Sequence, residues 1–260
     1  MHETTRQLFD EIHVTYNRAI YVQSDPLRYV YRYERPDDRE IVALLSALFA
    51  YGRVASIFSF LDRLLVRLGP NPAATLRETR ITGRELYYRF QTQKDTERLL
   101  AVLGEWLQVR TFPILKRPVS FDIYDAIDTL IDDLTASIPA TGRTQGWTFL
   151  VGKPGTRSVA KRWCLFFRWM VRRGFPDTGL YSMIRPDRLI YPLDTHILKI
   201  ARWQSLTSRR ATTRETAREI TAAFKNLSKS DPLKYDFALT RPGILNDRAL
   251  LDRLQQSSYP

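Results

Sequence analysis

Two consecutive apolar segments constrain the fold of this chain most strongly. Residues 41–51 are apolar on nearly every side of a helix, which is typical of a helix in the middle of a core. Residues 54–68 place their apolar side chains on one face at helical spacing, and a Gly-Pro-Asn-Pro sequence ends them. The residues of this face are Ile57, Phe60, Leu61, Leu64, Leu65 and Leu68. Such a pair of segments predicts a helical protein with a sizeable core.

The rest of the chain also lacks the alternation of a strand and has no repeat of fixed period. We expect further helices at residues 82–90, 95–106, 121–137, 158–173, 194–203, 214–227 and 232–239, and a long loop at 139–156. The predicted fold class is therefore all-α. We expect one unit over residues 1–260, with one lobe from residues 40–150 and another from 1–39 plus 151–260.

The charge is strongly positive. Forty Lys and Arg residues against 28 Asp and Glu leave a net charge of +12. The basic residues gather between Arg143 and Arg173, and Asp177 is the one acidic residue between positions 134 and 183. A localised basic segment favours a nucleic-acid partner, although a solvated surface would explain the charge as well.

Cysteine content and hydropathy exclude several classes. Cys164 is the single cysteine, so an intrachain disulfide, a four-cysteine zinc site and a cysteine-ligated iron–sulfur cluster are excluded. No apolar run approaches the ~18 residues that a membrane helix needs. We expect a soluble, monomeric cytoplasmic protein with no membrane partner, no cofactor and no metal ion.

Residues 152–173 combine a Gly- and Pro-containing loop with a basic, aromatic helix. Backbone N–H groups at the start of such a helix bind phosphate well. On the helix, Lys161, Arg168 and Arg172 share one face. The candidate DNA-binding residues of this segment are Lys153, Gly155, Arg157, Arg162, Arg168 and Arg172. The alternative is an amphipathic core helix with a solvated basic face.

Residues 191–203 place an aspartate at the start of a helix. Pro192 disfavours helix just before it, so Asp194 lies at the cap or in the first turn of the helix that follows. Most aspartates at such places only cap the helix, and His196 is explained by ordinary packing or capping. One Asp and one His do not make a metal site.

The sequence PLDTHILKIARWQSL, at residues 192–206, resembles the stretch that follows the helix–hairpin–helix in the endonuclease III superfamily of DNA glycosylases. The aspartate of that motif is the family's catalytic carboxylate, so the resemblance implies this role for Asp194. Gly152, Gly155 and Lys161 resemble the family's hairpin and the early lysine that is the nucleophile in bifunctional members. The implied fold is a two-lobed helical glycosylase with an atypical helix–hairpin–helix.

The match departs from endonuclease III in three respects. The compact Leu-Pro-Gly-x-Gly hairpin and the cluster-binding cysteines are absent, and Lys161 and Asp194 lie farther apart in the sequence. A long insertion of this kind is similar to the archaeal 8-oxoguanine glycosylases. Residues 25–243 also resemble a family of uncharacterised bacterial proteins, a domain of unknown function, that is marked by KR…RWMVR, PLDTH and DPxKYDFAL.

The resemblance implies a definite chemistry. A carboxylate near C1′ stabilises the positive charge that develops on the sugar, and a neutral lysine can attack C1′ and expel the base. The expelled base must first leave the stack and enter an apolar pocket. Candidate walls are Phe166, Trp169 and Phe237, for which ordinary core packing is the alternative.

Two further sites complete the hypothesis. By resemblance, Asp236 on a late helix contacts the flipped base, and an ion pair with Lys234 or Arg241 is the alternative. Tyr51 and Arg53, in one turn, are two more candidate DNA-binding residues, and Tyr51 is the candidate wedge that fills the gap left by the base.

From the sequence we therefore expect the protein to be an enzyme, a DNA glycosylase with AP-lyase activity in base-excision repair. Its expected substrate is double-stranded DNA that contains an oxidised purine such as 8-oxoguanine. The alternatives are a non-catalytic DNA- or RNA-binding protein with the same fold and a helical interaction protein whose charge is incidental.

Overall fold

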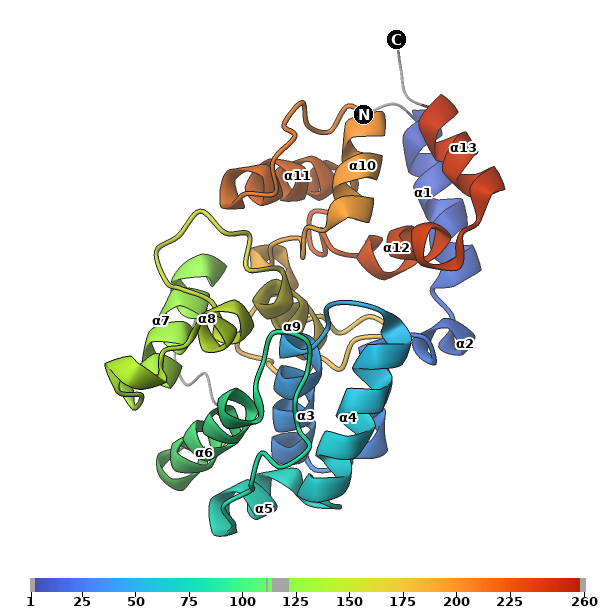
Figure 1. The fold of residues 1–260 in the computed structure, drawn as a ribbon. Helices are drawn as coiled ribbons and strands as arrows, with labels where there is room; N and C mark the ends of the chain where they lie inside the picture. Colours follow the sequence, from blue (N-terminus) through green and yellow to red (C-terminus); the bar gives the residue numbers. More distant parts are fainter. Residues whose placement is uncertain (1–2, 111, 114–121, 258–260) are drawn as a thin grey trace. The chain divides into compact units, whose positions relative to one another are not determined.

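The computed structural model describes residues 3–110, 112–113 and 122–257 (Figure 1). Within these ranges the chain forms α-helices and short 3-10 helices and has no β-strand; Tyr88–Gln91 and Ser158–Thr213 are isolated bridges. The all-α prediction is thus confirmed. No helix among these residues is long and apolar enough to cross a membrane. The chain divides into two compact units, Ser24–Thr156 and the combination of Met1–Gln23 with Arg157–Pro260.

The unit Ser24–Thr156 is built around a helix, α3, that is buried over most of its length. Its elements are η1 (Pro26–Arg32), α3 (Pro36–Leu48), α4 (Val54–Leu68), α5 (Pro72–Glu78), α6 (Gln93–Val109), α7 (Ile123–Ala136), η2 (Ala140–Gly142) and α8 (Gln145–Val151). Every residue of α3 from Glu40 to Leu48 is buried, and α3 packs against η1 and α5. Only the predicted apolar face of α4 is buried. These two helices therefore match the sequence pattern.

Two local predictions in this unit are wrong. Residues 82–90 form a loop rather than a helix, with Glu85 and Arg89 in the left-handed region at φ of 62° and 52°. A helix needs right-handed dihedrals at every position, so these residues end it. Residues 145–151 lie in the predicted loop but form α8, because the Thr144 hydroxyl accepts the Trp147 N–H at 3.0 Å and starts the helix. The expected helix at 121–137 begins at Ile123, and residue 121 lies outside the described residues.

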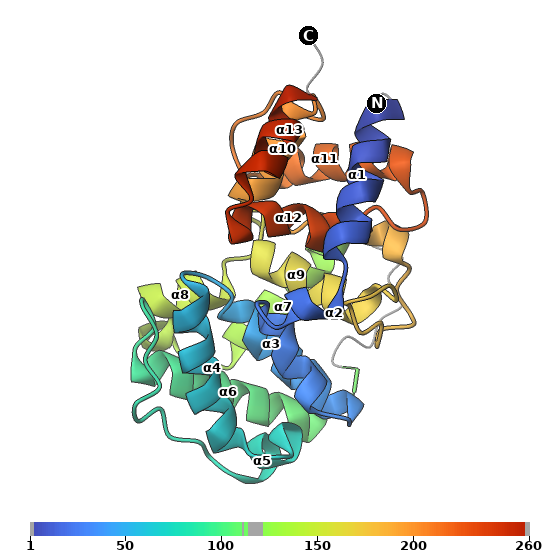
Figure 2. The same cartoon turned by 90° about the vertical axis from the view of Figure 1, so that its right-hand side faces the viewer.

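The second unit joins the two ends of the chain. Its elements are α1 (Glu3–Tyr16), α2 (Ala19–Val22), α9 (Lys161–Val171), η3 (Pro186–Arg188), α10 (Thr195–Trp203), α11 (Arg214–Leu227), α12 (Asp236–Leu245) and α13 (Arg248–Gln256). Helix α1 packs against α12, and α10 packs against both α12 and α13 (Figure 2). Phe224 lies at the centre of the core, with ring centroids 5.6 Å from Phe9 and 4.6 Å from Tyr191.

The carboxy-terminal helices differ from the prediction. The helix expected at residues 232–239 begins only at Asp236 and continues through Pro242 to Leu245. Residues 231–235 form a turn, so Pro232 precedes the helix instead of occupying its first position. Sequence patterns do not predict α1 and α13. Their apolar stripes are short, and these helices are stabilised by packing against other helices once the two chain ends come together.

Candidate functional site

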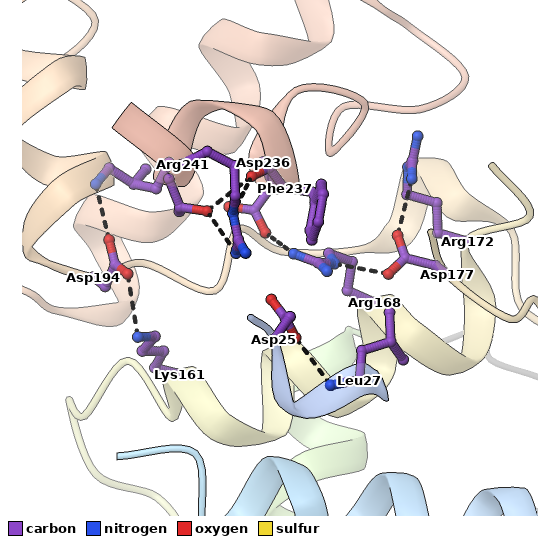
Figure 3. Close-up of polar contacts among 12 residues, drawn as sticks. Asp25, Leu27, Lys161, Arg168, Arg172, Asp177, Asp194, Asp236, Phe237 and Arg241 are labelled. Atoms are coloured by element: carbon purple, nitrogen blue, oxygen red, sulfur yellow. Dashed lines mark hydrogen bonds and ion pairs between the residues drawn. The ribbon is translucent and has the colours of Figure 1, made fainter. Parts of the chain in front are cut away.

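The starts of α9 and α10 bring Lys161 and Asp194 together. Lys161 is the first residue of α9 and follows Ala160, whose left-handed backbone (φ 47°) turns the chain into the helix. Asp194 is the N-cap of α10, and its Oδ1 accepts the Ile197 N–H at 2.9 Å. The other oxygen, Oδ2, accepts a hydrogen bond from Lys161 Nζ at 3.2 Å (Figure 3). The Asp194 carboxylate thus both caps α10 and binds the Lys161 amine.

The pair is reachable from solvent. The Lys161 side chain is 38% exposed and that of Asp194 is 16% exposed. The chain just before Lys161 is held by Arg214, whose backbone N–H bonds to the Arg157 carbonyl and whose Nε bonds to the Ser158 carbonyl, both at 3.1 Å. Both groups of the pair therefore have fixed positions and an open side.

A buried ion-pair network lies farther along α9. Arg168 donates from Nε to Asp177 Oδ1 at 3.1 Å and from Nη1 to Asp236 Oδ2. Arg172 donates from Nη1 to Asp177 Oδ2 and from Nε to Asp231 Oδ2, both at 2.9 Å. Figure 3 shows Arg168 between Asp177 and Asp236. Buried charges need such partners, because an unpaired charge loses its hydration without compensation.

The network corrects the expected roles of Arg168 and Arg172. Neither the predicted DNA-binding role nor the solvated face of the alternative matches these two positions, because they are only 3% and 4% exposed and carboxylates hold their guanidinium groups. Helical periodicity correctly places them on one face of α9, but it cannot tell which face is covered. The lone Asp177, four residues after the basic segment, was the available sequence signal of this burial.

Asp236 also has a different partner from the two that its sequence neighbours offer. Lys234 Nζ donates to Asp10 Oδ1 at 2.8 Å, and Arg241 Nε donates to the Phe237 carbonyl at 3.2 Å. Asp236 instead pairs with Arg168. The carboxylate is therefore a buried member of the network rather than a surface partner of its neighbours in the sequence.

Burial perturbs Asp236 and Tyr191. Desolvation raises the pKa of Asp236 to about 6; Arg168 opposes the shift, and the negative charges of Asp194 and Asp177 add to it. Burial likewise raises the pKa of Tyr191 well above its ordinary value, and the charge of Asp236 adds to this. Asp236 Oδ1 and the Tyr191 hydroxyl are buried without a hydrogen-bond partner among the described residues. Near pH 6 the network therefore gains or loses a proton.

The three predicted pocket walls lie in the core. Phe166, Trp169 and Phe237 are all buried, and Arg241 covers the Phe237 ring at 4.2 Å from its centroid. Phe166 packs edge-on against Tyr181 at 6.1 Å. Their burial and these ring contacts are what ordinary core packing, the alternative, would give.

The other predicted DNA-binding residues of residues 152–173 remain near the surface. Lys153 is exposed, and Gly155 has a left-handed φ of 66° with open space where a Cβ would lie. Arg157 is exposed and lies 3.7 Å from a carboxylate oxygen of Glu215. Arg162 is half-buried. Within residues 152–173, Lys153 and Arg157 are thus the most accessible of the predicted DNA-binding cations.

Tyr51 belongs to an aromatic cluster in the unit Ser24–Thr156 that sequence reasoning missed. Its ring lies 6.4 Å from that of Phe90 and 5.0 Å from that of Phe149, which are 56% and 41% exposed. The Arg89 guanidinium lies over the rings of Tyr51 and Phe90 at 5.9 and 5.4 Å. Arg53, at the N-cap of α4, is exposed. We call the four residues Tyr51, Arg89, Phe90 and Phe149 the Tyr51 cluster; no local pattern indicates it, because its members come from three separate segments.

Comparison with known proteins gives one positive result. No curated protein and no solved structure matches the chain. Residues 25–245, which include α9, α10 and both groups of the Lys161–Asp194 pair, match the family described as protein of unknown function DUF2400. The chain belongs to the DUF2400 family.

Proposed function

We propose that this protein is a DNA glycosylase with AP-lyase activity that removes an oxidised purine such as 8-oxoguanine. The observation that carries the proposal is the ion pair of Lys161 and Asp194, 3.2 Å apart and partly exposed at the starts of two helices. An amine nucleophile and a carboxylate are the two groups that this reaction needs.

The two groups have separate roles in the proposed reaction. The Lys161 amine, after losing a proton, forms a bond to C1′ while the glycosidic bond breaks and its electron pair leaves with the base, which takes up a proton. Asp194 stabilises the positive charge that develops on the sugar. Opening of the sugar ring leaves an imine between Lys161 and C1′. Loss of a C2′ proton then expels the 3′ phosphate and cleaves the strand.

DNA binding is supported by charge and by exposed aromatic rings. The net charge of +12 favours a polyanion, and Lys153 and Arg157 are exposed cations next to the start of α9 in the sequence. The Tyr51 cluster exposes Phe90 and Phe149 beside a guanidinium group, a combination suited to stacking on unpaired bases.

A non-catalytic nucleic-acid-binding protein is the second candidate. One observation favours it: Asp194 already has two structural tasks, capping α10 and binding the Lys161 amine. An ion pair that merely joins two helix starts would have the same geometry. The exposed cations and the Tyr51 cluster would bind nucleic acid without any reaction.

Borohydride trapping distinguishes the two functions. We would incubate the protein with duplexes that contain 8-oxoguanine, uracil, a thymine oxidation product or an abasic site. The enzyme hypothesis predicts a covalent adduct that Lys161→Ala abolishes, and slow base release in Asp194→Asn. Lys234→Ala is the matched control, because Lys234 forms a comparable, partly exposed pair with Asp10 in the same unit. Salt-sensitive binding without adduct or base release would instead support the binding protein.

A further inference from the structure

A basic hollow of about 470 Å³ lies where α10 ends and the loop to α11 begins. Figure 1 shows this loop above α11. The hollow is lined by the cations Lys199, Arg202 and Arg210, by the Trp203 ring, and by Ser205 and Ser208, among others. We call it the α10–α11 pocket. It contains neither Lys161 nor Asp194, so it is separate from the candidate site.

Among the described residues, the three cations of the α10–α11 pocket have no anionic partner. Lys199, Arg202 and Arg210 are exposed, and no carboxylate lines the pocket. In the part of the chain that the structure describes, none of the three forms an ion pair. Like charges gathered in one hollow repel one another, and a bound anion would relieve this repulsion.

The acidic side chain beside this loop already has a cationic partner. Glu219 on α11 lies 2.6 Å from Arg209 Nε. A hydrogen bond from the Thr207 side chain and the Arg209 guanidinium lower the pKa of Glu219, so it stays ionised and paired. Glu219 therefore leaves the positive charge of Lys199, Arg202 and Arg210 uncompensated.

The pocket is also held in shape before any ligand arrives. The buried Gln204 side chain donates from Nε2 to the Leu254 carbonyl and to Ser257 Oγ, both at 2.7 Å, and accepts from Thr5 Oγ1 at 2.9 Å. Ser205 follows with a left-handed φ of 52°, which turns the loop away from α10. A rigid base of this kind reduces the entropy lost on binding.

Lys199 is positioned over an aromatic ring. Its Nζ lies 4.5 Å from the Trp203 ring centroid, a distance typical of a cation–π contact. This contact restrains a long, flexible side chain at the wall of the pocket. The carboxyl end of α10 carries a partial negative charge, so the helix dipole does not assist an anion here. Any anion affinity must therefore come from the cationic side chains.

We propose that the α10–α11 pocket binds the phosphate group of a nucleotide, either free or within a nucleic-acid strand. The three cations and the hydroxyls of Ser205 and Ser208 can donate hydrogen bonds to phosphate oxygens, whereas the Thr207 hydroxyl is already engaged by Glu219. This binding needs no reaction at Lys161 and does not depend on the proposed glycosylase activity.

Calorimetric titration with four probes tests the proposal: pyrophosphate, a nucleoside 5′-diphosphate, and a short single strand with or without a 5′ phosphate. The pocket variant is Lys199→Gln/Arg202→Gln/Arg210→Gln. The control variant, Arg173→Gln/Arg188→Gln/Lys229→Gln, removes the same charge from exposed positions of the same unit. Circular dichroism confirms that each variant folds, and the single variant Lys199→Gln replaces the triple one if it does not.

We expect the pocket variant to bind at least one phosphate probe about tenfold more weakly than the wild type, with the control variant within about twofold. Loss confined to the diphosphates identifies a free nucleotide, and loss confined to the strands identifies a nucleic acid; both support the site. Equal affinities of the wild type and the pocket variant, or equal losses in the two variants, would overturn it.

Discussion

Replacing Asp236 with asparagine should change how stability depends on pH. The buried carboxyl has a pKa of about 6 in the folded protein, against an ordinary value of 3.8. Because the folded-state pKa is the higher one, the folded protein binds the proton more tightly than the unfolded chain does. The contribution of Asp236 to stability is therefore fully present below pH 3.8 and is lost as the pH rises through 6.

The size of this effect follows from the shift. Two pKa units correspond to about 3 kcal/mol, of which about 2 kcal/mol lies between pH 4.5 and 8. The substituted asparagine keeps the shape of the neutral acid but cannot titrate. Across that interval the free energy of unfolding of the wild type should thus fall by about 2 kcal/mol relative to that of Asp236→Asn. A pH-independent difference in stability between the two proteins does not affect this change.

Urea denaturation of both proteins at half-unit pH steps measures this difference directly. Titrating groups that do not interact with Asp236 cancel, since the two chains share them. A difference that stays constant between pH 4.5 and 8 would refute the reasoning. It would mean that Asp236 titrates as an ordinary carboxyl and that burial does not dominate its environment.

Three further substitutions test the packing and the surface. Gly243→Ala should lower the free energy of unfolding by about 1–3 kcal/mol, because the new Cβ would lie 2.1 Å from His196 Nδ1; a wild-type midpoint in urea would contradict this contact. Arg168→Met should cost about 3 kcal/mol in the same assay by leaving buried carboxylates short of a partner, whereas Arg157→Met should change stability by less than about 0.5 kcal/mol, and equal losses would refute the network's role. Phe90→Ala should weaken single-stranded DNA binding by about 1–3 kcal/mol in fluorescence anisotropy. Tyr31 is exposed outside the Tyr51 cluster, so an equal loss in Tyr31→Ala would contradict DNA binding by the cluster.

The helical core was predictable because its evidence is local. The all-round apolar pattern of α3 and the one-sided pattern of α4 each arise within a single helix, and they match the observed burial. The capping position of Asp194 was predictable for the same reason, since Pro192 and the helix that follows are its immediate neighbours. The loop at residues 82–90 was not, because its left-handed residues are not glycines.

The candidate site was predictable only in part because its contacts join distant segments. Helical spacing places Arg168 and Arg172 on one face, but their burial depends on Asp177, Asp231 and Asp236, which come from later parts of the chain. The aromatic residues of α9 carry the same ambiguity, since a core and a base-binding pocket select the same side chains.

Mapping the covalent bond tests the central claim most directly. After borohydride reduction with an 8-oxoguanine duplex, proteolysis and mass spectrometry would locate the modified residue. We expect the reduced sugar adduct on the peptide that contains Lys161, and none on the peptide that contains Lys234. An adduct at another lysine, or base release that persists unchanged in Lys161→Ala, would contradict it.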